Sequence, residues 1–271
     1  MIHADDAGLS TSENQATIQA LQKGLVNSYS IMVPCAWFYE MAQFALANPQ
    51  FDYGLHLTLT CEWKNYKFGP VLPLEEVQSL VDEDGHFHKT RETLKSNVKP
   101  QEVEKELSAQ IEKALNLGLK PSHLDCHMYS VAIDSDIISI YKNLGKKYNL
   151  PVLLSKELMT FVNYGAETAL EEGDLLVDKI YVAEFKYFEK GNLKKYYGDT
   201  LDNLQAGFNM ILIHPAFDTN EMKSITEDHP NFGSEWRQLD FEYFTSEECR
   251  SKIEKNGIQL VSWKEIESLI T

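Results

Sequence analysis

Strand-like and helix-like runs alternate along most of this 271-residue chain. Apolar runs such as 53–60 and 208–214 have the length of buried strands, whereas 37–47 carries apolar residues at helical spacing. This alternation is typical of βα units built around a parallel sheet. About seven units can be counted, so we expect an α/β fold, a distorted (β/α) barrel. The sequence contains no linker or internal repeat, which predicts a single domain over residues 1–271 with loop insertions.

Local signals set the ends of several elements. Ser10 and Glu13 form a capping box that opens a helix, and Gly24 ends it. Pro100 lies near the start of another helix, which Gly118 ends. Further elements are expected as strands at 26–33 and 151–154, helices at 136–147 and 193–206, and a helix-strand-helix set over 246–269. Two segments, 61–97 and 155–188, break the alternation and are expected to wall a substrate cleft.

Acidic and histidine residues stand at the ends of separate apolar runs. They are Asp5, Asp6, His56, His123, Asp125, His127 and His214. Such side chains are costly to bury beside Val, Ile and Leu unless they are paired or coordinate a metal, so we expect them to converge on one site. One carboxylate with two imidazoles is a usual ligand set for a catalytic divalent ion. The residue types therefore predict a metal-dependent hydrolase.

The strongest local pattern is the spacing of His123, Asp125 and His127. Residues two apart on a strand share one face, which places these three together and Leu124 on the opposite face. By the same rule His56 shares a face with two threonines and not with the neighbouring leucines. Both strands are therefore expected to have one core face and one polar face.

Four motifs, ADDAGLS, GLHLTLT, HLDCH and IHPAF, occur in this order along the chain. Over residues 2–260 the sequence resembles the YdjC-like (ChbG-type) carbohydrate deacetylases. The resemblance implies a distorted barrel of alternating strands and helices, and an enzyme that removes acetyl groups from N-acetylated sugars such as chitooligosaccharides. Two positions depart from the family pattern, His3 where Asn is usual and Tyr129 where another His is frequent.

The resemblance also implies roles for individual residues. Asp5 aligns with the catalytic base, and His214 with a second catalytic or substrate-polarising group. The implied metal ligands are Asp6, His56 and His127. The cofactor expected is one divalent ion, with Mg or Zn favoured and Co, Ni and Mn left open, because spacing alone does not separate these metals.

A second group of residues is predicted to contact the substrate. It consists of His123, Asp125, Arg237, Tyr129 and Trp63. The aromatic rings could stack on sugar rings or belong to the core, and Arg237 could bind a substrate oxygen or form an ion pair. His123 could instead only orient its neighbours.

Composition restricts the partners. The formal net charge of −16 opposes contact with a phosphate backbone, so nucleic acid is not expected. No apolar run approaches the length of a membrane span. The expected partner is a small carbohydrate, and a homodimer is left open. The four cysteines form no CxxC pair and are read as unpaired thiols. The run before Asp5 leaves almost no room for a full first strand, so we expect that the natural chain could begin upstream, and the compartment, cytoplasmic or exported, is left open.

Two other functions compete with the deacetylase hypothesis. A non-haem iron oxygenase could use His123, Asp125 and His214 as a two-histidine, one-carboxylate set. It would leave Asp5, Asp6 and His56 without roles. A sugar-binding protein that has lost catalysis is the third hypothesis, and residues suited to catalysis at every motif argue against it.

Overall fold

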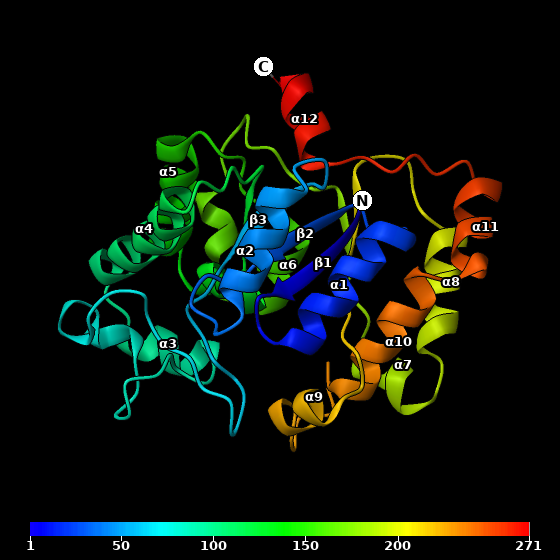
Figure 1. Cartoon of the computed structure of the whole chain (residues 1–271). Helices are drawn as coiled ribbons and strands as arrows, with labels where there is room; N and C mark the ends of the chain where they lie inside the picture. Colours follow the sequence, from blue (N-terminus) through cyan, green and yellow to red (C-terminus); the bar gives the residue numbers. More distant parts are fainter. Residues whose placement is uncertain (271) are drawn as a thin grey trace.

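The computed structural model describes the backbone of residues 1–270 and the side chains of residues 1–266. Its centre is a curled sheet of six parallel strands in the order β4-β3-β2-β1-β6-β5 (Figure 1). The strands are β1 (Ile2–Ala7), β2 (Ser28–Ile31), β3 (Tyr53–Leu57), β4 (Leu124–Cys126), β5 (Lys179–Tyr181) and β6 (Asn209–Ile213). The predicted α/β class with a parallel sheet is confirmed.

Helices surround this sheet. They are α1 (Thr11–Lys23), α2 (Phe38–Ala47), α3 (Arg91–Asn97), α4 (Pro100–Asn116), α5 (Ser135–Tyr148), α6 (Lys156–Val162), α7 (Phe185–Glu189), α8 (Leu193–Asp202), α9 (Asn220–Ile225), α10 (Ser234–Phe244), α11 (Glu247–Lys255) and α12 (Trp263–Ile270), with short 3-10 helices η1 (Leu74–Glu76), η2 (Gln78–Leu80), η3 (His127–Ile133) and η4 (Ala166–Ala169). In Figure 1, β1 points toward the end of the molecule where α3 and α9 lie, and α12 lies at the opposite end.

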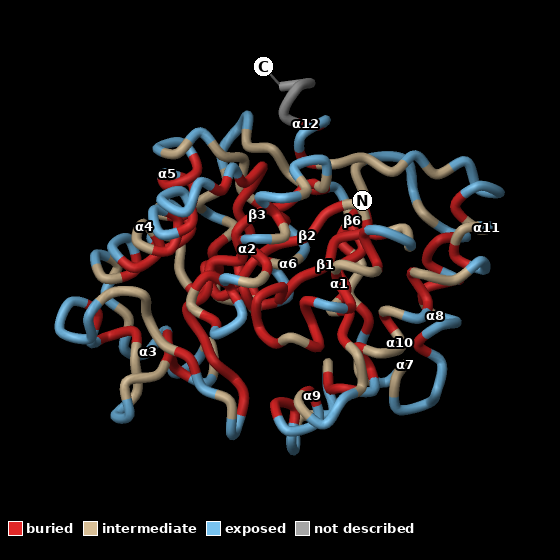
Figure 2. The backbone as a smooth tube through the Cα atoms, in the orientation of Figure 1, coloured by how far each residue is buried: buried red, intermediate tan, exposed pale blue. Residues whose placement is uncertain are grey.

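The outer face of the sheet is apolar. Ala4, Tyr29, Leu55 and Leu124 come from four neighbouring strands and are fully buried in the main hydrophobic cluster. Because alternate residues of a strand point to opposite sides, this face packs against the helices. Figure 2 shows the strands in the buried interior and the exposed residues on the outer helices and loops.

The inner face of the same strands is polar. Parallel register sets His3 of β1 opposite Ser28 of β2, and His56 of β3 opposite Asp125 of β4. All four side chains are buried. Polar groups in such a place must find partners among themselves, since water does not reach them. The inner face is therefore where the candidate site is built.

The expected count of about seven βα units is not confirmed. Segment 151–154, predicted as a strand, makes only isolated parallel bridges, Leu124 with Val152 and Leu154 with Leu176. No strand forms between α11 and α12 in the described part of the chain, although one was predicted within 246–269. Conversely, β5 lies inside 155–188, which the sequence presented as an insertion.

Three smaller expectations can also be compared with the structure. The first strand is not curtailed, since β1 begins at Ile2 and pairs with both β2 and β6. The cysteines are free and buried, as predicted. None of the helices among the described residues is both long and apolar enough to cross a bilayer.

Candidate active site

Left-handed backbone occurs at two points of the candidate site. Asp6, at the end of β1, has a φ of 65°, and Met128 and Tyr129, just after His127, have φ values of 53° and 49°. Left-handed backbone is uncommon for residues other than glycine and is often found at functional sites. Here it turns the chain sharply at the points where Asp6 and His127 must face the interior.

The structure brings Asp6, His56 and His127 together. One oxygen, Asp6 Oδ1, lies 3.1 Å from His127 Nδ1 and 3.3 Å from His56 Nε2. The three side chains offer ligand atoms that all lie within 4.8 Å of one another, and all three residues are buried. These are the three residues that the resemblance implied as metal ligands.

The second nitrogen of each imidazole is held by a carboxylate. His56 Nδ1 lies 2.8 Å from Asp125 Oδ1, and His127 Nε2 lies 2.9 Å from Glu62 Oε2. Carboxylates in this position commonly fix the ring orientation of metal-ligating histidines and raise their basicity. The arrangement therefore fits a divalent ion bound through Asp6, His56 Nε2 and His127 Nδ1.

Electrostatics in this cluster favour positive charge. Burial opposes ionisation of Asp6, but the charges of His127 and Arg237 hold the pKa of its carboxyl well below the usual range. Burial also opposes protonation of the histidines, but Glu62 and Asp6 raise the pKa of His127 to about 9, and nearby carboxylates raise the pKa of His56 strongly. Without a bound ion, protons on His56 and His127 supply the positive charge that balances the buried carboxylates.

Asp5 and His214 form the more open side of the site. Asp5 Oδ2 lies 3.7 Å from His214 Nε2, and their side chains are 11% and 15% exposed. Glu62, beside His127, is 10% exposed, whereas the proposed metal ligands are 5% or less. Asp5, Glu62 and His214 are therefore more exposed than the three candidate ligands.

Contacts with Asp240 and Phe232 hold His214 in place. Its backbone N–H donates to Asp240 Oδ2 at 3.0 Å, and its ring packs 4.8 Å from the ring of Phe232. Burial, together with the charge of Arg237, lowers the pKa of His214 to about 4, although Asp6 and Asp5 oppose the shift. The ring is therefore neutral in neutral solution.

The other members of the HLDCH motif lie deeper. Asp125 accepts from both His3 and His56, and the two histidines hold the pKa of its carboxyl well below the usual range against the effect of burial. His123 is fully buried and stacks on Trp263 with ring centroids 4.8 Å apart. Both residues are buried behind the candidate ligands, away from solvent.

Arg237 and the two aromatic residues predicted to contact substrate are also buried. Arg237 is 1% exposed and donates to Asp6 Oδ2 at 2.9 Å and Glu13 Oε2 at 2.7 Å. Trp63 is 1% exposed, and its ring faces the Arg237 guanidinium at 5.4 Å. Tyr129 is buried and accepts the Ser155 N–H through its hydroxyl. Arg237 therefore supports Asp6 directly and Trp63 packs on Arg237, whereas Tyr129 contacts the backbone at Ser155.

Sequence reasoning missed several residues that take part. Glu62 stands in the segment read as an insertion, where no periodicity marks it. Glu13 was read as half of a capping box. Ser10 does cap α1, but the Glu13 carboxylate binds Arg237 instead. Asp240 lies on α10 and gave no signal.

Comparison with known proteins identifies relatives of this chain in both sequence and structure. The model of the YdjC-like protein family matches residues 1–255. A carbohydrate deacetylase of Thermoanaerobacter pseudethanolicus is 26% identical over 97% of both chains, and one of Listeria monocytogenes is 28% identical over 98% of this chain and 99% of its own. A putative cellobiose-phosphate cleavage protein of Enterococcus faecalis has a solved structure that covers 98% of this chain and 97% of its own, with a TM-score of 0.79 and 27% identity. The chain belongs to the YdjC-like protein family.

Proposed function

We propose that this protein is a metal-dependent hydrolase that removes the acetyl group from an N-acetylated sugar or oligosaccharide. The observation that carries the proposal is the placement of Asp5 next to a buried Asp6-His56-His127 cluster, on its more open side. A free carboxylate beside a set of metal ligands is what hydrolysis of an amide requires. The carbohydrate deacetylases among the relatives support the acetylated-sugar class.

The residues divide the reaction between them. A divalent ion held by Asp6, His56 and His127 would polarise the acetyl carbonyl and acidify water. Asp5 accepts the proton of the attacking water and passes it to the departing nitrogen as the C–N bond breaks, so the amide and water give acetate and the free amine. His214, neutral and 3.7 Å from Asp5, donates a hydrogen bond to the reacting group. Asp125 and Glu62 hold the rings of His56 and His127 in place.

The test of this function is acetate release. The purified protein, loaded with Zn²⁺, Mg²⁺, Co²⁺, Ni²⁺ or Mn²⁺ in turn, is incubated with N-acetylated mono- and oligosaccharides, including chitooligosaccharides, with and without phosphate. We expect stoichiometric acetate and free amine from at least one sugar, with loss of turnover after chelation. Failure of every combination would contradict the proposal.

We expect the three proposed ligands to determine metal content. Asp6→Ala, His56→Ala and His127→Ala should each lose most of the ion bound between them, because a three-ligand open site cannot spare one ligand. Elemental analysis of the desalted proteins measures the loss. His86→Ala, which removes a partly exposed histidine far from the proposed ligands in sequence, is the matched control and should retain the wild-type content. Full occupancy in all three ligand variants would show that the assignment is wrong.

The role of His214 predicts a particular pH profile. His214→Gln should keep the metal and lower kcat by roughly two to four orders of magnitude, the usual contribution of a positioned proton-transfer or hydrogen-bonding group. Because the pKa of His214 is lowered to about 4, its protonated form disappears above that pH. Any fall of kcat/KM that the wild type shows in alkaline solution therefore does not come from His214 losing a proton, and the variant should show the same fall. If the variant lacks that fall, His214 acts as a protonated acid.

The other two hypotheses are less well supported. The oxygenase hypothesis grouped His214 with His123 and Asp125, but the groups of metal-ligating residues in the described part of the chain do not combine these three. Oxygen consumption by the iron-loaded protein, without acetate release, would favour it. A sugar-binding protein without catalysis would bind N-acetylated sugars and release no acetate.

A further inference from the structure

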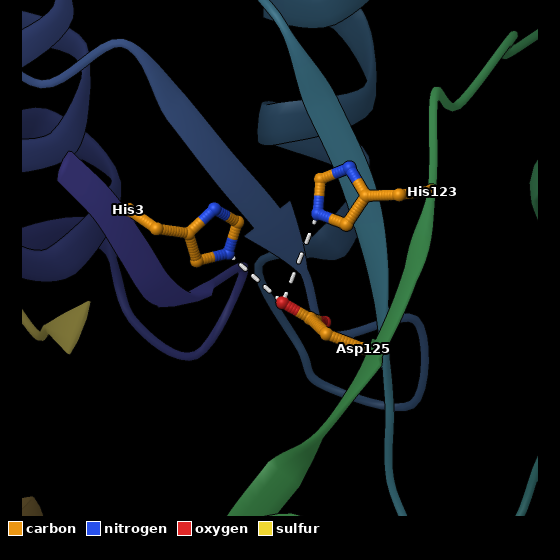
Figure 3. A group of neighbouring side chains, drawn as sticks. All are labelled: His3, His123 and Asp125. Atoms are coloured by element: carbon orange, nitrogen blue, oxygen red, sulfur yellow. Dashed lines mark hydrogen bonds and ion pairs between the residues drawn. The ribbon is translucent and has the colours of Figure 1, made fainter. Parts of the chain in front are cut away.

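A second cluster of potential metal-ligating side chains lies deeper in the interior than the Asp6-His56-His127 cluster. His3 of β1 and His123, just before β4, turn their rings toward the Asp125 carboxylate (Figure 3). Asp125 Oδ2 lies 2.9 Å from His3 Nε2 and 3.9 Å from His123 Nε2. The three ligand atoms lie within 4.8 Å of one another, and all three residues are buried. None of them belongs to the proposed catalytic ligand set.

Hydrogen bonds fix the tautomer of His123. Ser122 Oγ donates its only proton to the Tyr53 carbonyl at 2.9 Å, so it accepts from His123 Nδ1–H at 2.9 Å. The neutral ring then presents a bare lone pair at Nε2. This buried atom has no hydrogen-bond partner and faces a carboxylate. A lone pair and a carboxylate repel each other in a dry interior unless a cation lies between them.

The same reasoning applies to His3. Ser28 Oγ donates to Asp52 Oδ2 at 2.9 Å and so accepts from His3 Nδ1–H at 2.9 Å. His3 Nε2 lies 2.9 Å from Asp125 Oδ2 and 3.2 Å from Ser30 Oγ, so in the metal-free protein it carries a proton that a bound ion would replace. Asp5 Oδ1, 3.2 Å from this nitrogen and without an aligned hydrogen bond, adds negative charge at the same point.

Space for the ring of His123 is provided by β3. A Cβ atom on Gly54 would lie 2.5 Å from His123 Nε2, which real structures do not tolerate. Only glycine at this position lets the ring tip approach the strand and face Asp125. The orientation of His123 Nε2 therefore depends on Gly54 of β3.

We propose that His3, His123 and Asp125 form a second divalent-cation site of the zinc or cobalt class. Bonds of roughly 2.0–2.2 Å in a tetrahedral site set ligand atoms roughly 3.3–3.6 Å apart, and the separations of 2.9 and 3.9 Å lie on either side of this range. Two imidazoles and a carboxylate are ligands that such ions accept. The ion replaces the proton on His3 Nε2, and Asp125 links the two sites because its other oxygen holds His56.

Metal stoichiometry tests this site independently of the proposed reaction. The full chain is stripped with a chelator, loaded with excess Zn²⁺, desalted and analysed for zinc. We expect about two ions per wild-type chain, and about one in His3→Asn, in His123→Gln and in His56→Ala. The double variant His3→Asn/His56→Ala should bind none, and His86→Asn, at a partly exposed position, should keep both. Anomalous diffraction from zinc-loaded crystals should show the second peak among His3, His123 and Asp125.

Other outcomes overturn the proposal. One ion in the wild type, undiminished in His3→Asn and His123→Gln, would show that His3 is only a buried imidazolium. Two variants at different ligands guard against a folding defect in one, and circular dichroism identifies any such defect. Two ions bound without acetate release from any sugar would leave the second site standing and contradict the proposed function.

Discussion

Replacing Asp5 with Asn should lower kcat by roughly two to four orders of magnitude while the protein keeps its catalytic ion. Asn has the size of Asp but cannot accept a proton from water, and Asp5 is not one of the three proposed ligands. Steady-state acetate release gives kcat and KM, and elemental analysis gives metal content. The KM should change little, because the substitution preserves shape and polarity at the more open side of the site.

The control for this variant is Asp84→Asn, which removes an exposed carboxylate in a loop. It should have wild-type turnover. If Asp5→Asn emerges without metal, Asp5 is a ligand and the division between Asp5 and Asp6 is wrong. If it retains both metal and turnover, the base is another residue, and Glu62, 10% exposed beside His127, becomes the next candidate.

Replacing Arg237 with Met should reduce the free energy of unfolding of the metal-free protein by roughly 3–5 kcal/mol. The guanidinium is 1% exposed and pairs with Asp6 and Glu13, so its removal leaves buried carboxylates without their cation. Urea denaturation followed by circular dichroism measures the loss. Arg250→Met is the matched control, since Arg250 is 40% exposed and only 3.9 Å from Glu247 in a surface pair.

The effect of Arg237→Met should depend on pH in a defined direction. The folded-state pKa of Asp6 lies well below its unfolded value near 4, so its contribution to stability is present above about pH 4 and is lost as the pH falls toward the folded-state pKa. The difference between variant and wild type should therefore be largest near neutral pH and shrink in acid. A difference that grows on acidification would contradict the ion-pair explanation.

The sequence predicted the parallel α/β architecture and the residues that gather at the site. Alternating apolar runs revealed β1, β3, β4 and β6, because buried parallel strands leave a strong local signal. The six-residue β1 shows that a strand can begin at the second residue of the chain. By contrast, β5 spans only Lys179–Tyr181, with two of its three residues half-buried, so its pattern could not be told from a loop.

The supporting residues could not be predicted, for a different reason. Glu13 lies at the right distance from Ser10 for a capping box, and only the approach of α10 redirects its carboxylate to Arg237. Arg237 and Trp63 have the composition of a sugar site, yet they pack against each other in the interior. Tertiary neighbours decide such roles, and a single sequence does not specify which helix approaches which strand.

The polar inner face of the sheet couples the thermal stability of the protein to its proposed reaction. In most barrels this space holds branched apolar side chains that contribute to cohesion, but here it holds His3, Ser30, His56 and Asp125. Selection for a more stable protein would tend to replace such residues with aliphatic ones, and each replacement would remove a partner on which the proposed site depends. Under that proposal, this lineage gains heat tolerance most freely from its outer helices and loops, while the interior stays tied to the site.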